Sequence, residues 1–134
     1  MTEEKTIFDH ILAGNVPSYK VYEDDKTLAF LDVNPLAPGH TLVIPKSRAQ
    51  NIIDLSDEDN VALFDAVKKV TTKIEKGLDP DGFTIGINHT VGQAVQHIHV
   101  HIIPRWDDDG GGNVHSIVLN PPKEELEDVL KRIN

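Results

Sequence analysis

The stretch that decides the fold is His97-Ile98-His99-Val100-His101-Ile102-Ile103, in which three histidines alternate with aliphatic residues. Side chains two residues apart lie on one face of a β-strand, so this spacing predicts a strand with all three imidazoles on one surface. The intervening Ile98, Val100 and Ile102 would then face a core. A helix would scatter the histidines, because two residues advance it by about 200°. We therefore expect a row of groups that titrate near neutral pH, held on a rigid element.

The composition indicates one globular domain and excludes several classes of function. A chain of 134 residues is long enough for one core, and the absence of cysteine excludes disulfides and thiolate metal sites. The net charge of −9 disfavours binding to duplex nucleic acid or to anionic membranes. No apolar run approaches the ~20 residues of a membrane span, and the polar N-terminus does not resemble a signal or transit peptide. We expect a cytoplasmic protein with neither nucleic acid nor membrane as a partner.

The hydrophobic pattern predicts an α+β fold, an antiparallel sheet with a long helix packed on one face. Ser56 is the expected N-cap of that helix and Gly77 its end. We expect a single domain over 1–134, with a tail and helix over 105–134, and a mobile loop over 107–112 because its aspartates and glycines do not pack. The expected strands are 19–23, 27–32, 40–44, 83–88 and 97–103, and the expected helices are 6–14, 56–77 and 123–133. The expected buried stripe of the long helix comprises Leu63, Phe64, Val67, Val70 and Ile74.

Residues 92–105, which hold the three histidines and their lead-in from Gly92 to Gln96, resemble the signature of the histidine-triad (HIT) family. The first half of the chain resembles the same family in blocks that follow in the right order: 6–8, 13–18, 21–25, 28–35 and 37–46. This resemblance implies a HIT-like, dimeric fold that binds a purine nucleotide or dinucleotide. It also implies a hydrolase or nucleotidyl transferase that acts at a nucleoside 5′-α-phosphate through a covalent nucleotidyl-histidine.

The resemblance also implies roles for individual residues, carried over by matching position. His99 would be the nucleophile, and His97 and His101 would hold or protonate it. Asp32 matches the carboxylate that holds the ribose hydroxyls, and His40 matches a histidine that helps to orient the triad. The phosphate-side loop is matched by Asn88, Gly92 and Gln93. The apolar walls of the base pocket are matched by Ile7, Phe8, Ile11, Val16, Phe30, Leu31 and Val33.

This chain departs from the family pattern in places that bear on metal and substrate. Some bacterial members hold zinc with two cysteines and a histidine, where this chain has Thr6, Asp9 and Arg48. We expect neither metal nor cofactor, since three imidazoles and several amides supply the charge that a metal would. The phosphoramidase branch has a serine where this chain has Ala94. Together with Pro104-Arg105, this favours dinucleoside polyphosphates and leaves phosphoramidates open.

Other interpretations of the same residues stay open at this point. Three alternating imidazoles suit zinc, copper or nickel, although no carboxylate stands at a companion ligand spacing. A nucleotide sensor with negligible turnover would share the pocket of a slow enzyme. Asp32 also fits the start of a turn before Asn34-Pro35, and His40 also fits a packed strand residue. The stripe of Ile7, Phe8 and Ile11 equally fits a core.

Overall fold

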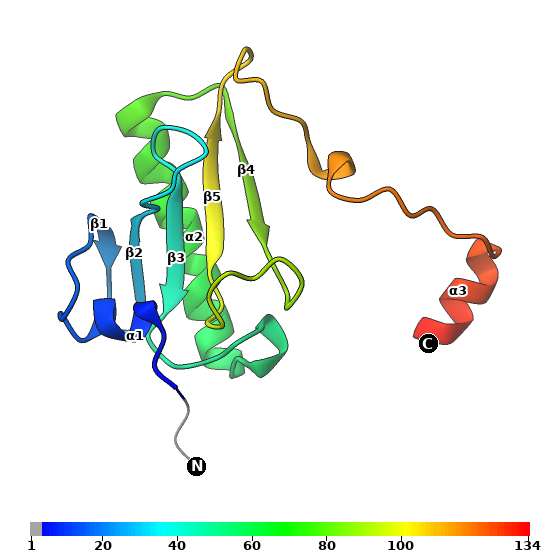
Figure 1. Ribbon diagram of the computed structural model, residues 1–134, viewed down its shortest axis with the longest axis horizontal. Helices are drawn as coiled ribbons and strands as arrows, with labels where there is room; N and C mark the ends of the chain where they lie inside the picture. Colours follow the sequence, from blue (N-terminus) through cyan, green and yellow to red (C-terminus); the bar gives the residue numbers. More distant parts are fainter. Residues whose placement is uncertain (1–3) are drawn as a thin grey trace.

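One antiparallel sheet of five strands, in the order β1-β2-β3-β5-β4, organises the protein (Figure 1). The structure is a computed structural model that describes residues 4–134. The strands are β1 (Lys20–Glu23), β2 (Thr27–Leu31), β3 (Thr41–Pro45), β4 (Gly82–Ile87) and β5 (Val100–Arg105). The helices are α1 (Ile7–Leu12), α2 (Asp57–Leu78) and α3 (Leu126–Ile133), with short 3-10 turns η1 (Ile52–Asp54) and η2 (Val114–Ser116). The predicted α+β fold, with the long helix on one face, is confirmed.

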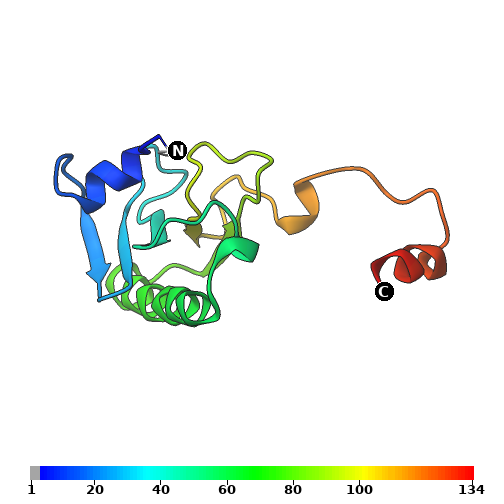
Figure 2. The same cartoon turned by 90° about the horizontal axis from the view of Figure 1, so that it is seen from below.

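The two faces of the sheet carry separate clusters of buried side chains, and α1 and α2 lie on opposite sides of it (Figure 2). On the α2 face, Ile98, Val100 and Ile102 are completely buried together with side chains of α2. On the α1 face, Phe8 packs in one cluster with Phe30. The alternation predicted from the histidine stretch therefore places its aliphatic residues in the main core.

The histidine strand is shorter than predicted, because β5 begins only at Val100. The amide of Ile98 donates to the carbonyl of Ala49 at 2.7 Å, outside the ladder with β3. Pro45, the last residue of β3, has no N–H for such a ladder, and its carbonyl accepts from the His97 ring at 2.9 Å. His97 and His99 thus precede the strand in a segment held by bonds to other parts of the chain. The predicted strand over 97–103 is wrong at its start.

Helix α2 begins as predicted but ends later. Ser56 is its N-cap, and the Ser56 hydroxyl accepts from the amide of Asp59 at 3.1 Å. Gly77 lies inside the helix, so the prediction that it ends the helix is wrong. The helix ends at Asp79, which adopts a left-handed φ of 49° and is followed by Pro80. Aspartate tolerates this conformation better than most residues, and the proline that follows cannot continue a helix.

The buried stripe of α2 also differs from the prediction at one position. Phe64 is 40% exposed, whereas Ala66 is completely buried. Leu63, Val67, Val70 and Ile74 are buried as predicted. At about 100° per residue, Leu63, Ala66, Val67, Val70 and Ile74 fall within one sector of the helix, and Phe64 lies outside it. The small Ala66 lets the helix approach the strands, and Phe64 turns outward.

Residues 106–134, which we call the C-terminal arm, leave the end of β5 and run away from the sheet to α3 (Figures 1 and 2). The predicted C-terminal helix is present but begins only at Leu126. Its apolar side chains Leu126, Leu130 and Ile133 are exposed. Among the described residues, no helix is both long and apolar enough to span a membrane.

The start of the arm is bonded to the sheet, contrary to the predicted unpacked loop over 107–112. The carboxylate of Asp109 accepts from Nε of Arg105 at 2.6 Å and from the amides of Trp106 and Gly111 at 3.0 and 2.9 Å. Arg105 also donates to the carbonyl of Gly112 at 2.7 Å. One aspartate and one arginine therefore organise a segment whose composition alone predicts no packing.

The packing of α2 on the sheet predicts unequal costs for two substitutions. Replacing the completely buried Ile98 by alanine should lower the free energy of unfolding by about 2–5 kcal/mol, because it leaves a cavity in the main core. Replacing the outward Phe64 by alanine should cost less than about 1 kcal/mol. Urea denaturation of both variants measures the difference. Equal losses would contradict the placement of this helix.

Candidate active site

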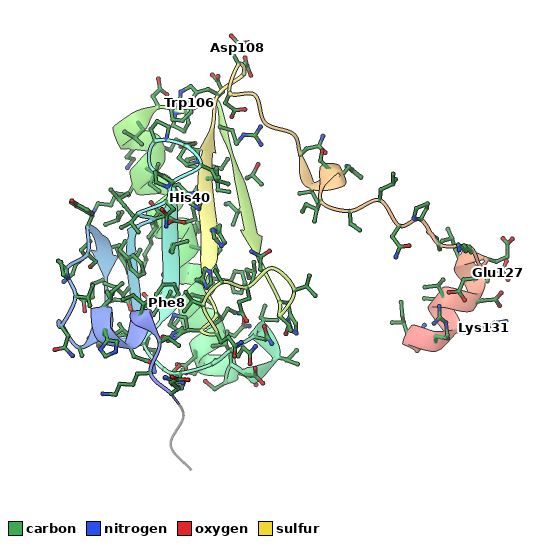
Figure 3. The ribbon with its side chains drawn as sticks, in the orientation of Figure 1. Phe8, His40, Trp106, Asp108, Glu127 and Lys131 are labelled. Carbon is green, nitrogen blue, oxygen red and sulfur yellow. The ribbon has the colours of Figure 1, made fainter. Side chains whose placement is uncertain are left out.

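The three triad imidazoles and His40 form a continuous row of rings on the α1 face of the sheet. The ring centroids of His99 and His101 are 4.9 Å apart, and those of His40 and His101 are 5.2 Å apart. Phe8 of α1 stands edge-on to His97 and His99 at 5.8 and 5.1 Å. Phe8 lies near one end of the row and His40 near the other (Figure 3). The fold therefore brings together the four histidines that sequence reasoning selected.

Two backbone carbonyls set the protonation of His97 and His99. Nδ1 of His99 lies 2.8 Å from the carbonyl oxygen of His97, and Nε2 of His97 lies 2.9 Å from that of Pro45. A carbonyl only accepts, so each of these ring nitrogens must carry the hydrogen. In neutral His99 the lone pair therefore resides on Nε2. The ring that resemblance marks as the nucleophile is held in the tautomer that an Nε2 attack requires.

A chain of hydrogen bonds sets the protonation of His101 in the same way. The amide of Leu36 donates to Nδ1 of His40 at 3.0 Å, so the hydrogen of neutral His40 is on Nε2. That group donates to Nδ1 of His101 at 2.9 Å, which places the hydrogen of His101 on its own Nε2. Within residues 4–134, this buried Nε2 has no hydrogen-bond partner. A buried donor without a partner, beside the lone pair of His99, suits a bound group.

Burial keeps these imidazoles uncharged. It lowers the pKa of His101 to about 4, with further lowering from the nearby rings of His99 and His40. Burial also lowers the pKa of His97, against the hydrogen bond to the Pro45 carbonyl and the charge of Asp9, and lowers the pKa of His40, against the charge of Asp32. At neutral pH these three rings are therefore neutral, as the deduced tautomers require.

Asp32, His40 and His101 place ligand atoms within 4.8 Å of one another, a spacing that a metal ion could bridge. Metal coordination by Nε2 of His40 would require the hydrogen on Nδ1, where the amide of Leu36 already points its own hydrogen. Two N–H groups would then face each other. The arrangement instead matches a hydrogen-bond chain, with Asp32 Oδ2 at 3.5 Å from the His40 Nε2.

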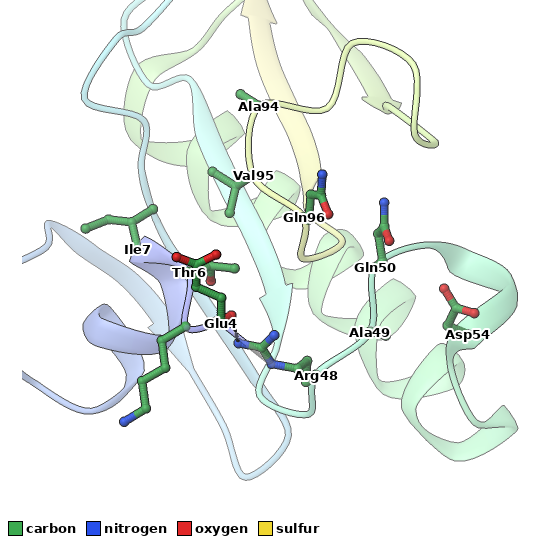
Figure 4. Close-up of a pocket in the computed structure, with 11 residues that line it drawn as sticks. Glu4, Thr6, Ile7, Arg48, Ala49, Gln50, Asp54, Ala94, Val95 and Gln96 are labelled. Atoms are coloured by element: carbon green, nitrogen blue, oxygen red, sulfur yellow. Dashed lines mark hydrogen bonds between the residues drawn. The ribbon is translucent and has the colours of Figure 1, made fainter. Parts of the chain in front are cut away.

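Thr6, Asp9 and Arg48, the three residues where the resemblance would place zinc ligands, are joined through Asp9. Thr6 and Asp9 form a capping box at the start of α1. Arg48 forms an ion pair with the Asp9 carboxylate and donates to the carbonyl of Glu4 at 2.9 Å, beside a cavity of about 930 Å³ that extends to residues 94–96 (Figure 4). An ion pair thus joins α1 to the segment after β3. The expectation that no metal binds here stays a prediction.

Asp32 starts a turn, as one of its two sequence interpretations predicts, while its match to a ribose-binding carboxylate stays a prediction. Its Oδ1 accepts from the amide of Asn34 at 2.9 Å, as at the start of a turn, while its Oδ2 lies beside His40. Its side chain is 18% exposed, so it remains accessible to a ligand.

The residues matched to the base pocket differ in burial. Phe8 and Phe30 are buried in edge-to-face contact at 5.5 Å, and Ile11 packs against their cluster. Val16 and Leu31 are partly buried, whereas Ile7 and Val33 are 46% and 76% exposed. The pair of aromatic rings therefore forms a floor, and the exposed residues can only form its edges.

The predicted phosphate-side loop is tied to the segment after β3. The Gln93 amide group donates to the Gln50 carbonyl at 2.8 Å, and the Asn51 amide group donates to the Thr90 hydroxyl at 3.0 Å. Gly92 adopts a φ of +79°, which glycine reaches without strain. Sequence reasoning missed Gln50 and Asn51, because no spacing in the sequence links them to a loop some 40 residues further along.

Comparison with known proteins decides the family. The sequence profile of the HIT domain matches residues 13–108. This chain belongs to the HIT family. It is 41% identical to the protein named hit of Bacillus subtilis over 134 residues, which cover 97% of this chain and 92% of that protein. A HIT family protein from Bacillus anthracis has the same fold, with a TM-score of 0.85 at 36% identity and coverage of 98% and 94% of the two chains.

Two further HIT relatives carry names of enzymes. An adenosine 5′-monophosphoramidase of Schizosaccharomyces pombe is 39% identical over 107 residues, which cover 78% of this chain and 77% of that protein. An adenylylsulfatase of Arabidopsis thaliana is 36% identical over 133 residues, which cover 94% and 68%. Hydrolysis of nucleotides is therefore an activity found among relatives of this HIT protein.

The lowered pKa of His101 predicts a loss of stability in acid. A histidine with a pKa of about 4 when folded and 6.5 when unfolded binds more protons in the unfolded state between these values. Its contribution is complete above pH 6.5 and is lost as the pH falls towards 4. The free energy of unfolding of the wild type should thus fall on the order of 1–3 kcal/mol further than that of His101→Phe over this range. Parallel pH profiles in urea denaturation would contradict the burial of a neutral ring.

Proposed function

We propose that this HIT protein is a hydrolase or nucleotidyl transferase that cleaves a bond at the 5′-α-phosphate of a nucleotide, with His99 as nucleophile. One observation carries the proposal: the Nε2 lone pair of His99 lies beside the unpartnered Nε2–H of His101. A nucleophile and a hydrogen-bond donor on neighbouring rings are what nucleophilic displacement at phosphorus needs. The relatives named as hydrolases of adenylyl compounds support the same class of reaction.

The first step forms a bond between phosphorus and Nε2 of His99 while the bond from phosphorus to the leaving atom breaks. The electron pair of the broken bond stays with the leaving atom, which accepts a hydrogen bond from the Nε2–H of neutral His101 and takes up a proton from solvent. The carbonyl of His97 stabilises the positive charge of the modified His99 through the Nδ1–H. Water then attacks phosphorus and releases the nucleotide from His99.

The remaining site residues fit the binding of a purine nucleotide. The Asp32 carboxylate would hold the ribose hydroxyls, while His40 orients His101. Asn88, Gly92 and Gln93 would border the phosphate, with Gln93 fixed by Gln50. The base would lie on the aromatic floor. Its walls would be Ile7, Phe8, Ile11, Val16, Phe30, Leu31 and Val33.

Removal of the nucleophile tests the proposal directly. His99→Ala should lower the release of adenosine 5′-monophosphate from adenosine 5′-phosphoramidate by about 10³-fold or more, because no other group can form the covalent intermediate. Replacement of His10, which lies on α1 outside the row of rings, by alanine is the matched control and should retain activity. Chromatography measures the product, and mass spectrometry of acid-quenched enzyme should detect an adenylyl group on His99. Normal turnover by His99→Ala, or nucleotide binding by the wild type with no turnover, would refute the proposal.

We also propose that the protein is a homodimer joined through the free edge of β4. Strand β4 is an outer strand, and its sequence from Gly82 to Ile87 contains no charged residue, with Ile85 44% exposed. The opposite edge, β1, carries Lys20 and Glu23 and an irregular register, features that discourage pairing between sheets. An uncharged edge is therefore the face that a second copy of the chain would cover.

A charge placed on the edge of β4 tests the dimer. Ile85→Lys should convert a dimer into a monomer at micromolar concentration, because it places a charge on an edge that carries none in the wild type. Tyr19→Lys, at the other edge of the sheet and 70% exposed in the wild type, should leave the dimer intact. Sedimentation velocity distinguishes the two species. A monomeric wild type, or dissociation by both substitutions, would contradict this interface.

A further inference from the structure

The phosphate-side loop, residues 88–93, reverses direction at a strained residue, Thr90. Thr90 has a φ of +64°, and the amide of Val91 donates across it to the carbonyl of His89 at 2.7 Å. A hydrogen bond between residues two apart, closed around a positive φ, is a strained form of γ-turn. Residues other than glycine avoid a positive φ, and a branched Cβ such as that of threonine makes it costlier still. The loop therefore does not keep this shape by the preference of its own backbone.

The turn at Thr90 decides where the rest of the loop lies. The amide of Gln93 donates to the carbonyl of Thr90 at 3.3 Å, which closes a second turn whose third residue, Gly92, has a φ of +79°. A positive φ at that position, as in a type II turn, calls for glycine. A Cβ on Gly92 would lie 3.6 Å from the side-chain oxygen of Asn88, so the two ends of the loop meet. The residues assigned to the phosphate are thus gathered by this turn.

Asn51 holds Thr90 in its strained conformation from outside the loop. Its side-chain oxygen accepts from the Thr90 amide at 3.2 Å, and its amino group donates to the Thr90 hydroxyl at 3.0 Å. Asn51 is 8% exposed, and its own backbone amide donates to the Asp54 carboxylate at 3.1 Å. Thr90, in contrast, is exposed. A buried and fixed side chain therefore binds both polar groups of an exposed residue, and relaxation of Thr90 to a negative φ would turn its N–H away from this partner.

The two residues that precede this asparagine extend the support along the chain. The carbonyl of Gln50 accepts from the Gln93 side chain at 2.8 Å, and the Gln50 side chain donates back to it at 3.2 Å. The carbonyl of Ala49 accepts from the amide of Ile98 at 2.7 Å. Residues 49–51, which we call the brace, thus run antiparallel to the segment that they support. The brace connects the strained turn with the stretch that carries the histidines.

We propose that Asn51 is a positioning residue for the phosphate of the substrate. By holding Thr90 at a positive φ, it keeps Gly92 and Gln93 where they border the phosphate. This inference rests on the proposed function, in which that loop borders the phosphate, and it adds a residue that acts only through another. Without Asn51 the loop relaxes, and the affinity for a phosphate falls in proportion to the fraction of molecules whose loop keeps the turn.

Binding of adenosine 5′-monophosphate and of adenosine to the full chain separates positioning from general stability. The two ligands differ only in the phosphate, so the ratio of their dissociation constants reports on the loop. Asn51→Ala should weaken binding of the monophosphate about 10-fold and leave binding of adenosine unchanged. Asn60→Ala, which removes the same amide from α2, is the matched control and should leave both constants unchanged. NMR titration measures them. An unchanged ratio in Asn51→Ala would overturn the inference, whether both affinities fall together or neither falls.

Thr90→Gly tests whether Asn51 acts by opposing strain. Glycine adopts a positive φ without the penalty of a Cβ, so the loop of this variant has less need of the brace. In the Thr90→Gly background, Asn51→Ala should weaken binding of the monophosphate by less than about 3-fold, against about 10-fold in the wild type. Lost packing around Asn51 would cost the same in both backgrounds. Equal losses would therefore overturn the inference.

Thr90→Pro reaches the same turn without altering a buried residue. Because Thr90 is exposed, this variant should fold, but proline fixes φ near −65° and cannot form the turn. Binding of the monophosphate should weaken at least about 10-fold, with binding of adenosine unchanged. An unchanged ratio in Thr90→Pro, in a protein whose wild type forms the His99 adduct, would overturn this inference and leave the proposed function intact. A wild type that forms no His99 adduct and binds the monophosphate no more tightly than adenosine would refute the proposed function, and this inference with it.

Discussion

The structure depends on the alternation of side chains along one central segment that is covered on both faces. Ile98, Val100 and Ile102 are completely buried beneath α2, and this burial leaves the intervening histidines on the opposite face. A shift of one residue in the pairing of β5 would place imidazoles in the main core and isoleucines in the site. The hydrophobic burial that stabilises the sheet therefore also determines which way the histidines point.

The chemistry of the row is set by backbone groups more than by other side chains. Three ring nitrogens each bind a backbone group: the carbonyl of Pro45, the carbonyl of His97 or the amide of Leu36. The bond between His40 and His101 then fixes the tautomer of His101 as well. Backbone groups of a packed sheet hardly move, so each ring is held in one tautomer and one orientation. Burial adds to this by lowering the pKa of His101 to about 4. The burial that keeps the rings neutral is also the reason why we expect the fold to lose stability in acid.

The C-terminal arm shows how a tertiary contact changes which groups a side chain is free to bind. In the sequence, Arg105 follows the triad closely and is a natural partner for a phosphate. In the structure its guanidinium is bonded to Asp109, Thr84 and Gly112, which fixes the start of the arm. The aspartates and glycines after Trp106 predict only a loop, yet Asp109 folds this segment back onto the strand. An arginine whose guanidinium is bonded within its own chain has little charge left to offer a ligand.

The class of fold, the capping of α2 by Ser56 and the choice of four histidines were all predictable before the structure was known, because each follows from local spacing or from resemblance in contiguous blocks. The four histidines are His97, His99, His101 and His40. The sequence by itself did not determine that β5 begins at Val100, that α2 continues past Gly77, or that Phe64 turns outward. Those outcomes depend on what each segment meets in space. Only the folded chain fixes the tautomers of His97 and His101, through Pro45 and His40, and ties the loop at residues 90–93 to Gln50 and Asn51. A hydrogen bond between residues some 40 or 60 positions apart leaves no period or spacing in the sequence, since only the folded chain brings the two groups within reach.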